Sequence, residues 1–248
     1  MLIEMKQELS WRNDSLMKMN VLRNEEIIGC FESPYLSREE LRTNGLFQFR
    51  GTYSGEHTYD IQFLTMPCPN DYTDGMFSYS KKDSSTGIKY TMMKMSYDVT
   101  KDNQKFTQIL TMQEAQKKKW LFSPAKTLDY YAWQIGTDHY KCYHVSKQGM
   151  GVWYCVYKND TLFAEMHKSM QVTDYLNTYK LYLADDANID LMCLITGILH
   201  GKHYETVKPN TTGDLKSENI METKNTICNE TRQGMLDKFD PEFPKRVG

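Results

Sequence analysis

Most of the signatures that would identify a function are missing from this chain. It has no excess of either charge, since 30 Lys and Arg side chains are balanced by 32 Asp and Glu side chains, for a formal net charge of −2. Proteins that bind nucleic acid through its phosphates need a basic surface. We therefore expect no nucleic-acid partner.

Long apolar runs are also missing. The longest one, residues 191–199, has about half of the roughly 20 residues that a membrane-spanning helix needs. Charged side chains interrupt residues 1–8 every few positions, so the apolar core of a signal peptide cannot form there. We expect a soluble, cytoplasmic protein without a transmembrane segment.

The six cysteines never occur in a Cys-x-x-Cys pair, which excludes a zinc knuckle and a thioredoxin-type redox pair. In a cytoplasmic protein the thiols should be free. Walker A, Gly-x-Gly-x-x-Gly, His-Glu-x-x-His and Gly-x-Ser-x-Gly motifs are absent as well. An enzyme whose residues meet only in space stays open, but nothing in the sequence calls for a metal ion or another cofactor.

Short aromatic and β-branched runs separated by turn residues fill most of the chain and predict an antiparallel meander. Residues 81–87 have the composition of a hairpin turn, and Gly149 and Gly151 can adopt the positive φ of tight turns. The expected strands, about a dozen, cover residues 27–32, 46–53, 58–65, 76–80, 88–97, 106–112, 130–135, 139–145, 152–157, 161–167 and 175–183, with 120–122 as one more candidate.

One helix is predicted, at residues 187–203, after the last expected strand. Asp185, Asp186 and Asn188 are suitable N-cap residues. The apolar residues point in nearly every direction around the axis, and a helix of that kind is buried on all sides. The core positions of this helix are Ile189, Leu191, Leu194, Ile195 and Ile198.

A closed barrel can cover such a helix on every side. The expected fold class is α+β, mainly β: a closed antiparallel barrel of about twelve strands around a central C-terminal hydrophobic helix. This barrel is one domain over residues 1–204. A β-sandwich with the helix between sheet and tail is the alternative. Residues 205–248 are a polar tail that forms a short helix, an added strand or a linker.

The segment from about Phe106 to Tyr204 resembles the tubby C-terminal-like superfamily, which includes tubby-like proteins, phospholipid scramblases, LURP-one-related proteins and small bacterial members. The resemblance rests on residues 178–199, where a strand ends in acidic residues and leads into the apolar helix, after an antiparallel meander. It implies a twelve-stranded barrel around a central helix and a non-enzymatic role in lipid contact, membrane-peripheral regulation or scaffolding. The phosphoinositide-binding cations of tubby proteins have no counterparts that can be assigned here.

The only dense basic cluster is Lys117, Lys118 and Lys119, followed by Trp120. Lysines beside an aromatic residue can bind an anionic lipid surface, each cation contributing about 1 kcal/mol. A second signal is usually needed for stable attachment. The alternative is a solvated loop or a lysine-protected edge strand.

Other chemistry-bearing residues are less grouped. Cys142 and His144 share one face of an expected strand and His139 takes the other, a pattern open to a nucleophile pair or two metal ligands. His200 and His203 lie three apart on the helix. Residues 186–190 imitate the start of a calcium loop, but Leu191 and Gly197 stand where that loop needs Gly and Glu.

The sequence leads to two functional hypotheses from different classes, and a third is kept as a further alternative. The first is a non-enzymatic binding module that contacts anionic phospholipid head groups or a partner protein at the membrane periphery, through Lys117, Lys118, Lys119 and Trp120. The alternative is a cryptic enzyme or metal-binding protein that uses Cys142 and His144. A purely structural, partner-binding subunit is the third.

Overall fold

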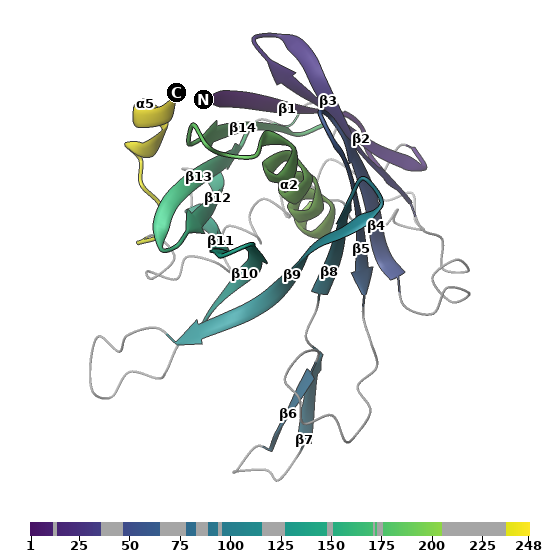
Figure 1. Ribbon diagram of the computed structural model, residues 1–248, viewed down its shortest axis with the longest axis vertical. Coiled ribbons are helices and arrows are strands. Elements are labelled where there is room, and N and C mark those ends of the chain that lie inside the picture. The colour runs from purple at the N-terminus through teal and green to yellow at the C-terminus, as the bar shows by residue number, and fades with distance from the viewer. Residues whose placement is uncertain are drawn as a thin grey trace.

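The computed structural model shows a mainly β protein built on one closed antiparallel barrel of twelve strands (Figure 1). Fourteen strands and two helices are described. The structure describes residues 1–11, 14–35, 47–64, 78–82, 89–93, 96–115, 127–147, 151–170, 172, 176–204 and 237–248.

The strands pair around the ring in the order β1-β14-β13-β12-β11-β10-β9-β8-β5-β4-β3-β2, and a separate two-stranded ribbon is formed by β6 and β7. The barrel strands are β1 (Leu2–Leu9), β2 (Leu16–Arg23), β3 (Glu26–Pro34), β4 (Phe47–Ser54), β5 (Thr58–Leu64), β8 (Ser96–Lys101), β9 (Gln104–Ala115), β10 (Thr127–Ile135), β11 (Asp138–Lys147), β12 (Gly151–Lys158), β13 (Thr161–Lys168) and β14 (Thr178–Leu183). The ribbon and helices are β6 (Ser78–Lys82), β7 (Lys89–Met93), α2 (Ile189–His203) and α5 (Phe243–Val247).

The predicted closed barrel of about twelve strands is confirmed, but its membership differs from the prediction. β1 and β2 were not expected at all. The expected strand 88–97 is two strands, β7 and β8, which belong to different sheets, and the expected strand 76–80 corresponds to β6, outside the barrel. The candidate strand 120–122 lies outside the described residues.

Tight turns join the strands at one end of the barrel. Three of them are two-residue turns with positive φ at both positions, which is the type I′ geometry that matches strand twist. Their residues are Asn24 and Glu25, Asp102 and Asn103, and Asn159 and Asp160. Gly151 has the positive φ expected of it, at 104°.

The strands direct alternate side chains into one large buried cluster, which defines the inner face of the wall. In β1, for example, Ile3 and Met5 are fully buried while Glu4 and Lys6 form a partly exposed ion pair on the outer face. The same cluster includes the apolar residues of α2, with Leu191, Leu194 and Ile198 each at most 2% exposed.

The predicted helix is present and begins two residues later than expected, at Ile189. Asn188 is the N-cap, and its side-chain oxygen accepts a hydrogen bond of 2.9 Å from the amide of Leu191. Every residue from Asp190 to Gly201 is buried, so no face of that stretch meets solvent.

In the order of the ring, β2 to β5 lie on one side of β1, and β14 and β13 lie on the other side. α2 contacts strands on both sides. The helix packs against β2, β3, β4 and β5. On the other side, Thr196 Oγ1 lies 2.8 Å from the sulfur of Met166 in β13, and His200 Nδ1 lies 3.0 Å from the hydroxyl of Tyr179 in β14.

Two glycines allow α2 and the wall to approach closely. The ring of Phe31 in β3 lies between Gly51 of β4 and Gly197 of α2. A Cβ at Gly197 would lie 2.5 Å from the ring carbon Cδ1 of Phe31, and one at Gly51 would lie 2.7 Å from its Cζ. Phe31 is fully buried, so its ring has little room to move away.

The end of the polar tail packs on the outer face of the barrel. α5 contacts β14, and its Phe243 is only 4% exposed. The amino group of Met1 donates hydrogen bonds to the carbonyls of Leu183 in β14 and Val247 in α5. In Figure 1, α5 accordingly lies beside the N-terminus of the chain, outside the ring of strands.

Gly197→Ala tests the close approach of helix and wall. Alanine normally stabilises a helix interior by about 1 kcal/mol over glycine, but here its methyl group would overlap the Phe31 ring. We expect a net loss of about 1–3 kcal/mol in the free energy of unfolding, measured by urea denaturation. Adding Phe31→Leu, which makes room, should recover part of that loss. A stabilised Gly197→Ala variant would contradict the packing.

Candidate functional site

The two ends of the barrel differ in charge and in the length of their connections. One end, which we call the turn end, holds the short connections: residues 24–25, 55–57, 102–103, 136–137, 159–160 and 184–188. These residues include no Lys or Arg. Their acidic side chains are all exposed: Glu25, Glu56, Asp102, Asp160, Asp185 and Asp186.

The opposite end, the loop end, holds the long connections. They join β3 to β4, β5 to β8, β9 to β10, and β13 to β14. Residues 116–126, between β9 and β10, contain four lysines and no acidic residue. The turns of one end are therefore acidic, although Lys101, Lys105 and Lys158 lie close to them, and one of the long connections of the opposite end is basic.

The β9–β10 hairpin extends beyond the rest of the wall at the loop end. β9 pairs with β8 only up to Leu110, whereas its pairing with β10 continues to Ala115. β10 pairs with β11 only from Tyr131 onward, although it begins at Thr127. Among the described pairings, the outer part of this hairpin is thus a two-stranded arm, and it projects from the barrel in Figure 1.

The predicted lipid-contact residues Lys117, Lys118, Lys119 and Trp120 lie in residues 116–126, outside the described residues. Their place in the chain is nonetheless informative, because β9 ends at Ala115 and β10 begins at Thr127. In the sequence they belong to the connection between the two strands of the arm.

The β6–β7 ribbon is inserted between β5 and β8 and projects from the same end of the barrel (Figure 1). Its two strands pair from Ser78 opposite Met93 to Lys82 opposite Lys89, so a hairpin is present, but Lys81 and Lys82 of the predicted turn 81–87 belong to β6 and the rest of that turn lies outside the described residues. The ribbon backbone carries Lys81, Lys82 and Lys89. Two lysine-bearing hairpins therefore leave the loop end.

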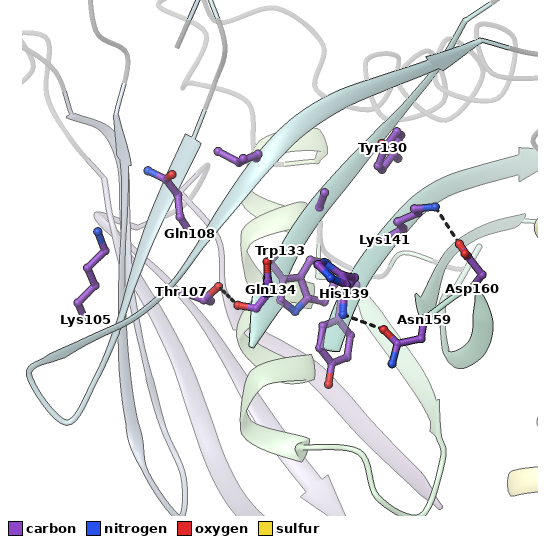
Figure 2. A pocket seen from close by; sticks show the side chains of 13 residues that line it. Lys105, Thr107, Gln108, Tyr130, Trp133, Gln134, His139, Lys141, Asn159 and Asp160 are labelled. Atoms are coloured by element: carbon purple, nitrogen blue, oxygen red, sulfur yellow. Dashed lines mark hydrogen bonds and ion pairs between the residues drawn. The ribbon is translucent and has the colours of Figure 1, made fainter. Parts of the chain in front are cut away.

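A groove of about 740 Å³ lies on β9, β10 and β11, nearer the turn end (Figure 2). We call it the wall groove; its lining includes Lys105, Gln108, Tyr130, Gln134, Lys141 and Asp160. Leu110 and Ala132 contribute apolar surface between these polar groups.

Many polar groups of the wall groove are bound to one another. Lys141 Nζ lies 2.8 Å from a carboxylate oxygen of Asp160, and the hydrogen bond from Lys141 lowers the pKa of that carboxyl. The hydroxyl of Thr107 donates to the carbonyl of Gln134 over 2.8 Å, and the amide of His139 donates to the side-chain oxygen of Asn159 over 2.9 Å. The groove has a nearly balanced charge and no nucleophile paired with a base, so its chemistry is that of a polar contact surface.

Cys142 and His144 both lie on the inner face of β11, as their spacing predicted. Cys142 is fully buried, and burial raises the pKa of its thiol far above the ordinary value. A thiol in that state is protonated at neutral pH and lacks the thiolate that a nucleophile needs. The contacts of His144 include the Tyr204 hydroxyl, 3.2 Å from Nε2, and the ring of Tyr154.

The other histidines also have local structural contacts. His200 is fully buried beside Tyr179, whereas His139 is exposed at the start of β11. The side chain of His203 lies outside the described part. Among the residues that the structure does describe, no group of three or more His, Cys, Asp and Glu side chains is arranged to hold a metal ion.

The acidic residues around the start of α2 form hydrogen bonds and ion pairs with neighbouring elements. Asp190 accepts a hydrogen bond of 2.9 Å from the amide of His57 in the β4–β5 connection. Asp186 forms an ion pair of 3.1 Å with Lys158.

The outer face of β11–β13 holds a second apolar cluster, separate from the core. We refer to this cluster, together with two neighbouring polar residues, as the aromatic strip; it consists of Tyr143, Trp153, Cys155, Tyr157, Glu165 and His167. We call C-terminal segment residues 237–248. Phe239 stacks on Trp153 with the ring centroids 4.4 Å apart, so the C-terminal segment covers the aromatic strip.

The aromatic strip was not predicted from the sequence, although a signal for it exists. In β12, the six residues from Gly151 to Val156 are all buried, with no alternation. A continuous apolar run indicates a strand that is covered on both faces. The sequence pattern of residues 152–157 predicts a strand, but it does not identify the residues that cover its outer face.

Alkylation tests the state of the thiols. Cys142 should not react with iodoacetamide in the folded protein, because it is sealed from solvent and protonated. Cys30 is partly exposed, and burial together with the neighbouring Glu32 raises its pKa to about 11. Near pH 8 it should react about 100-fold more slowly than in the unfolded chain, and faster as the pH rises. Mass spectrometry of the labelled peptides follows both; preferential labelling of Cys142 would support a nucleophile there.

Comparisons with known proteins do not identify a family or a function for this chain. Neither the protein-family models nor the curated proteins nor the solved structures return a match to this chain. Within the part of the chain that the structure describes, no helix has both the length and the apolar character that crossing a bilayer requires.

Proposed function

We propose that this protein is a non-catalytic binding module of the tubby-like type that docks on anionic lipid head groups through the loop end of its barrel. In this proposal α2 is the central rod of the barrel. Its burial on every face from Asp190 to Gly201, and its contacts to β3, β13 and β14, support that placement.

The observation that carries the proposal is the projecting β9–β10 arm. Its strands pair with each other beyond the points where they leave β8 and β11, and the connection at its tip contains Lys117, Lys118, Lys119 and Trp120. An arm of this kind presents cations and an aromatic residue ahead of the barrel body. That combination suits a bilayer surface, where cations meet phosphates and an indole enters the head-group layer.

The charge distribution along the barrel axis supports the same orientation. The acidic turn end would be repelled by an anionic surface, and the lysines of residues 116–126 would be attracted to it. The β6–β7 ribbon, which leaves the same end with Lys81, Lys82 and Lys89, supplies the second attachment point that stable peripheral binding requires.

Vesicle sedimentation tests this function. Wild type should sediment with vesicles of phosphatidylcholine and phosphatidylserine, and much less with phosphatidylcholine alone. Lys117/Lys118→Glu should weaken the partition at least about 30-fold, because two favourable contacts of about 1 kcal/mol each are lost. Added salt should weaken wild-type binding.

The matched control reverses two lysines near the turn end. Lys101/Lys105→Glu changes the net charge by the same amount but alters the opposite end of the barrel. It should keep binding within about twofold of wild type. Equal losses in the two variants would mean that only net charge matters. No binding by wild type would contradict lipid docking and leave a protein partner as the ligand of the loop end.

A further inference from the structure

The C-terminal segment binds the aromatic strip as a peptide ligand binds a receptor. Phe239 stacks on Trp153 at 4.4 Å with an interplanar angle of 27°, and it also contacts the ring of His167 at 6.0 Å. Trp153 is only 6% exposed as a result. One aromatic anchor thus fills the centre of the contact.

Main-chain contacts flank this anchor on both sides. The hydroxyl of Tyr157 donates to the carbonyl of Lys238 over 2.9 Å, and the amide of Asp240 donates to Glu165 over 2.9 Å. The Lys238 ammonium lies 4.4 Å from the ring centroid of Tyr143. The strip therefore contacts the main chain on either side of a Phe, together with the side chain of the preceding Lys.

Glu165 makes the strip selective for such a peptide. Its carboxylate is fully buried on the outer wall, with His167 Nε2 at 3.1 Å and Cys155 Sγ at 4.0 Å. A buried carboxylate needs hydrogen-bond donors. The peptide amide of Asp240 supplies one, so a covering segment has to present a main-chain amide at that position.

None of these contacts requires the segment and the strip to belong to the same molecule. Residues 205–236 lie between Tyr204 and Asp237, and fully extended they would span at most about 110 Å. The chain that joins the C-terminal segment to the barrel is therefore long enough to reach a neighbouring molecule.

We propose that the aromatic strip accepts the C-terminal segment of a second copy of this chain in place of its own. A second copy presents the same Lys238, Phe239 and Asp240, so an exchanged segment makes every contact described above. The own segment is favoured by its attachment. Exchange therefore increases with protein concentration, or when the contact within one molecule is weakened. This inference is independent of the proposed lipid docking, which involves the loop end.

Two complementary variants of the full chain test the exchange. Phe239→Ala keeps the strip but loses the anchor of the segment, whereas Trp153→Ala keeps the segment but loses its stacking partner. Each alone should sediment as a monomer of 29.1 kDa. Mixed, they should form a one-to-one dimer of twice that mass, at least tenfold more abundant than in either sample alone. As a control, Phe239→Ala mixed with the double variant Phe239→Ala/Trp153→Ala should stay monomeric, because no intact segment is present.

A labelled peptide removes the dependence on how well Trp153→Ala folds. A fluorescent peptide of residues 237–248 should bind full-length Phe239→Ala at least tenfold more tightly than wild type, whose strip is occupied. The same peptide with Phe239→Ala should not bind. If the intact peptide fails to bind a Phe239→Ala protein that melts like wild type, or the variant mixture stays monomeric with both partners folded, the proposal is overturned.

Discussion

The structure depends on the burial of α2 on every face. Each residue from Asp190 to Gly201 is buried, so apolar or hydrogen-bonding partners must surround the helix. One flat sheet would cover only one side of it. The closed ring of strands leaves no unpaired strand edge, and its buried side chains form one cluster with those of α2. The tight approach of Phe31 to Gly197 shows that helix and wall are fitted to each other at the level of single methyl groups.

The wall is not uniform around the ring. On β1 and β2 its outer face carries ion pairs such as Lys18 with Glu8, which is ordinary solvent-exposed surface. On β11–β13 the outer face is aromatic and would be an exposed apolar patch without the C-terminal segment. Phe239 of the C-terminal segment therefore covers apolar surface on the outer face, as α2 does on the inner face. A strand that is apolar on both faces requires two covers, and the chain provides both.

Sequence patterns were sufficient for the helix, the closed barrel and most of the strands between Thr58 and Leu183, because there aromatic and β-branched runs alternate with turn residues. They were insufficient for β1 and β2. In β1 the inner positions are Ile3, Met5 and Gln7, and charged residues occupy the positions between them. The alternation of buried and exposed positions is regular, but so short a segment with several charges lacks the aromatic and β-branched runs from which the other strands were predicted. The lysines of residues 116–126 can be recognised in the sequence because they lie next to one another. The aromatic strip was not, because covering it requires residues about 80 positions away, as in the contact of Lys238 with Tyr157.

The parity of an antiparallel barrel explains why the long connections gather at one end. Successive connections alternate between the two ends, so the type I′ turns after β2, β8 and β12 all fall at the turn end. Twist-matched two-residue turns leave no room for insertions there. Every long connection, including the β6–β7 ribbon and residues 116–126, therefore belongs to the loop end, where a rigid scaffold can present variable loops. The aromatic strip is free of that constraint, because it is built from strand side chains along the wall. The two proposed binding surfaces, one at the loop end and one on the side of the wall, lie apart from each other, so each could change without disturbing the packing of α2.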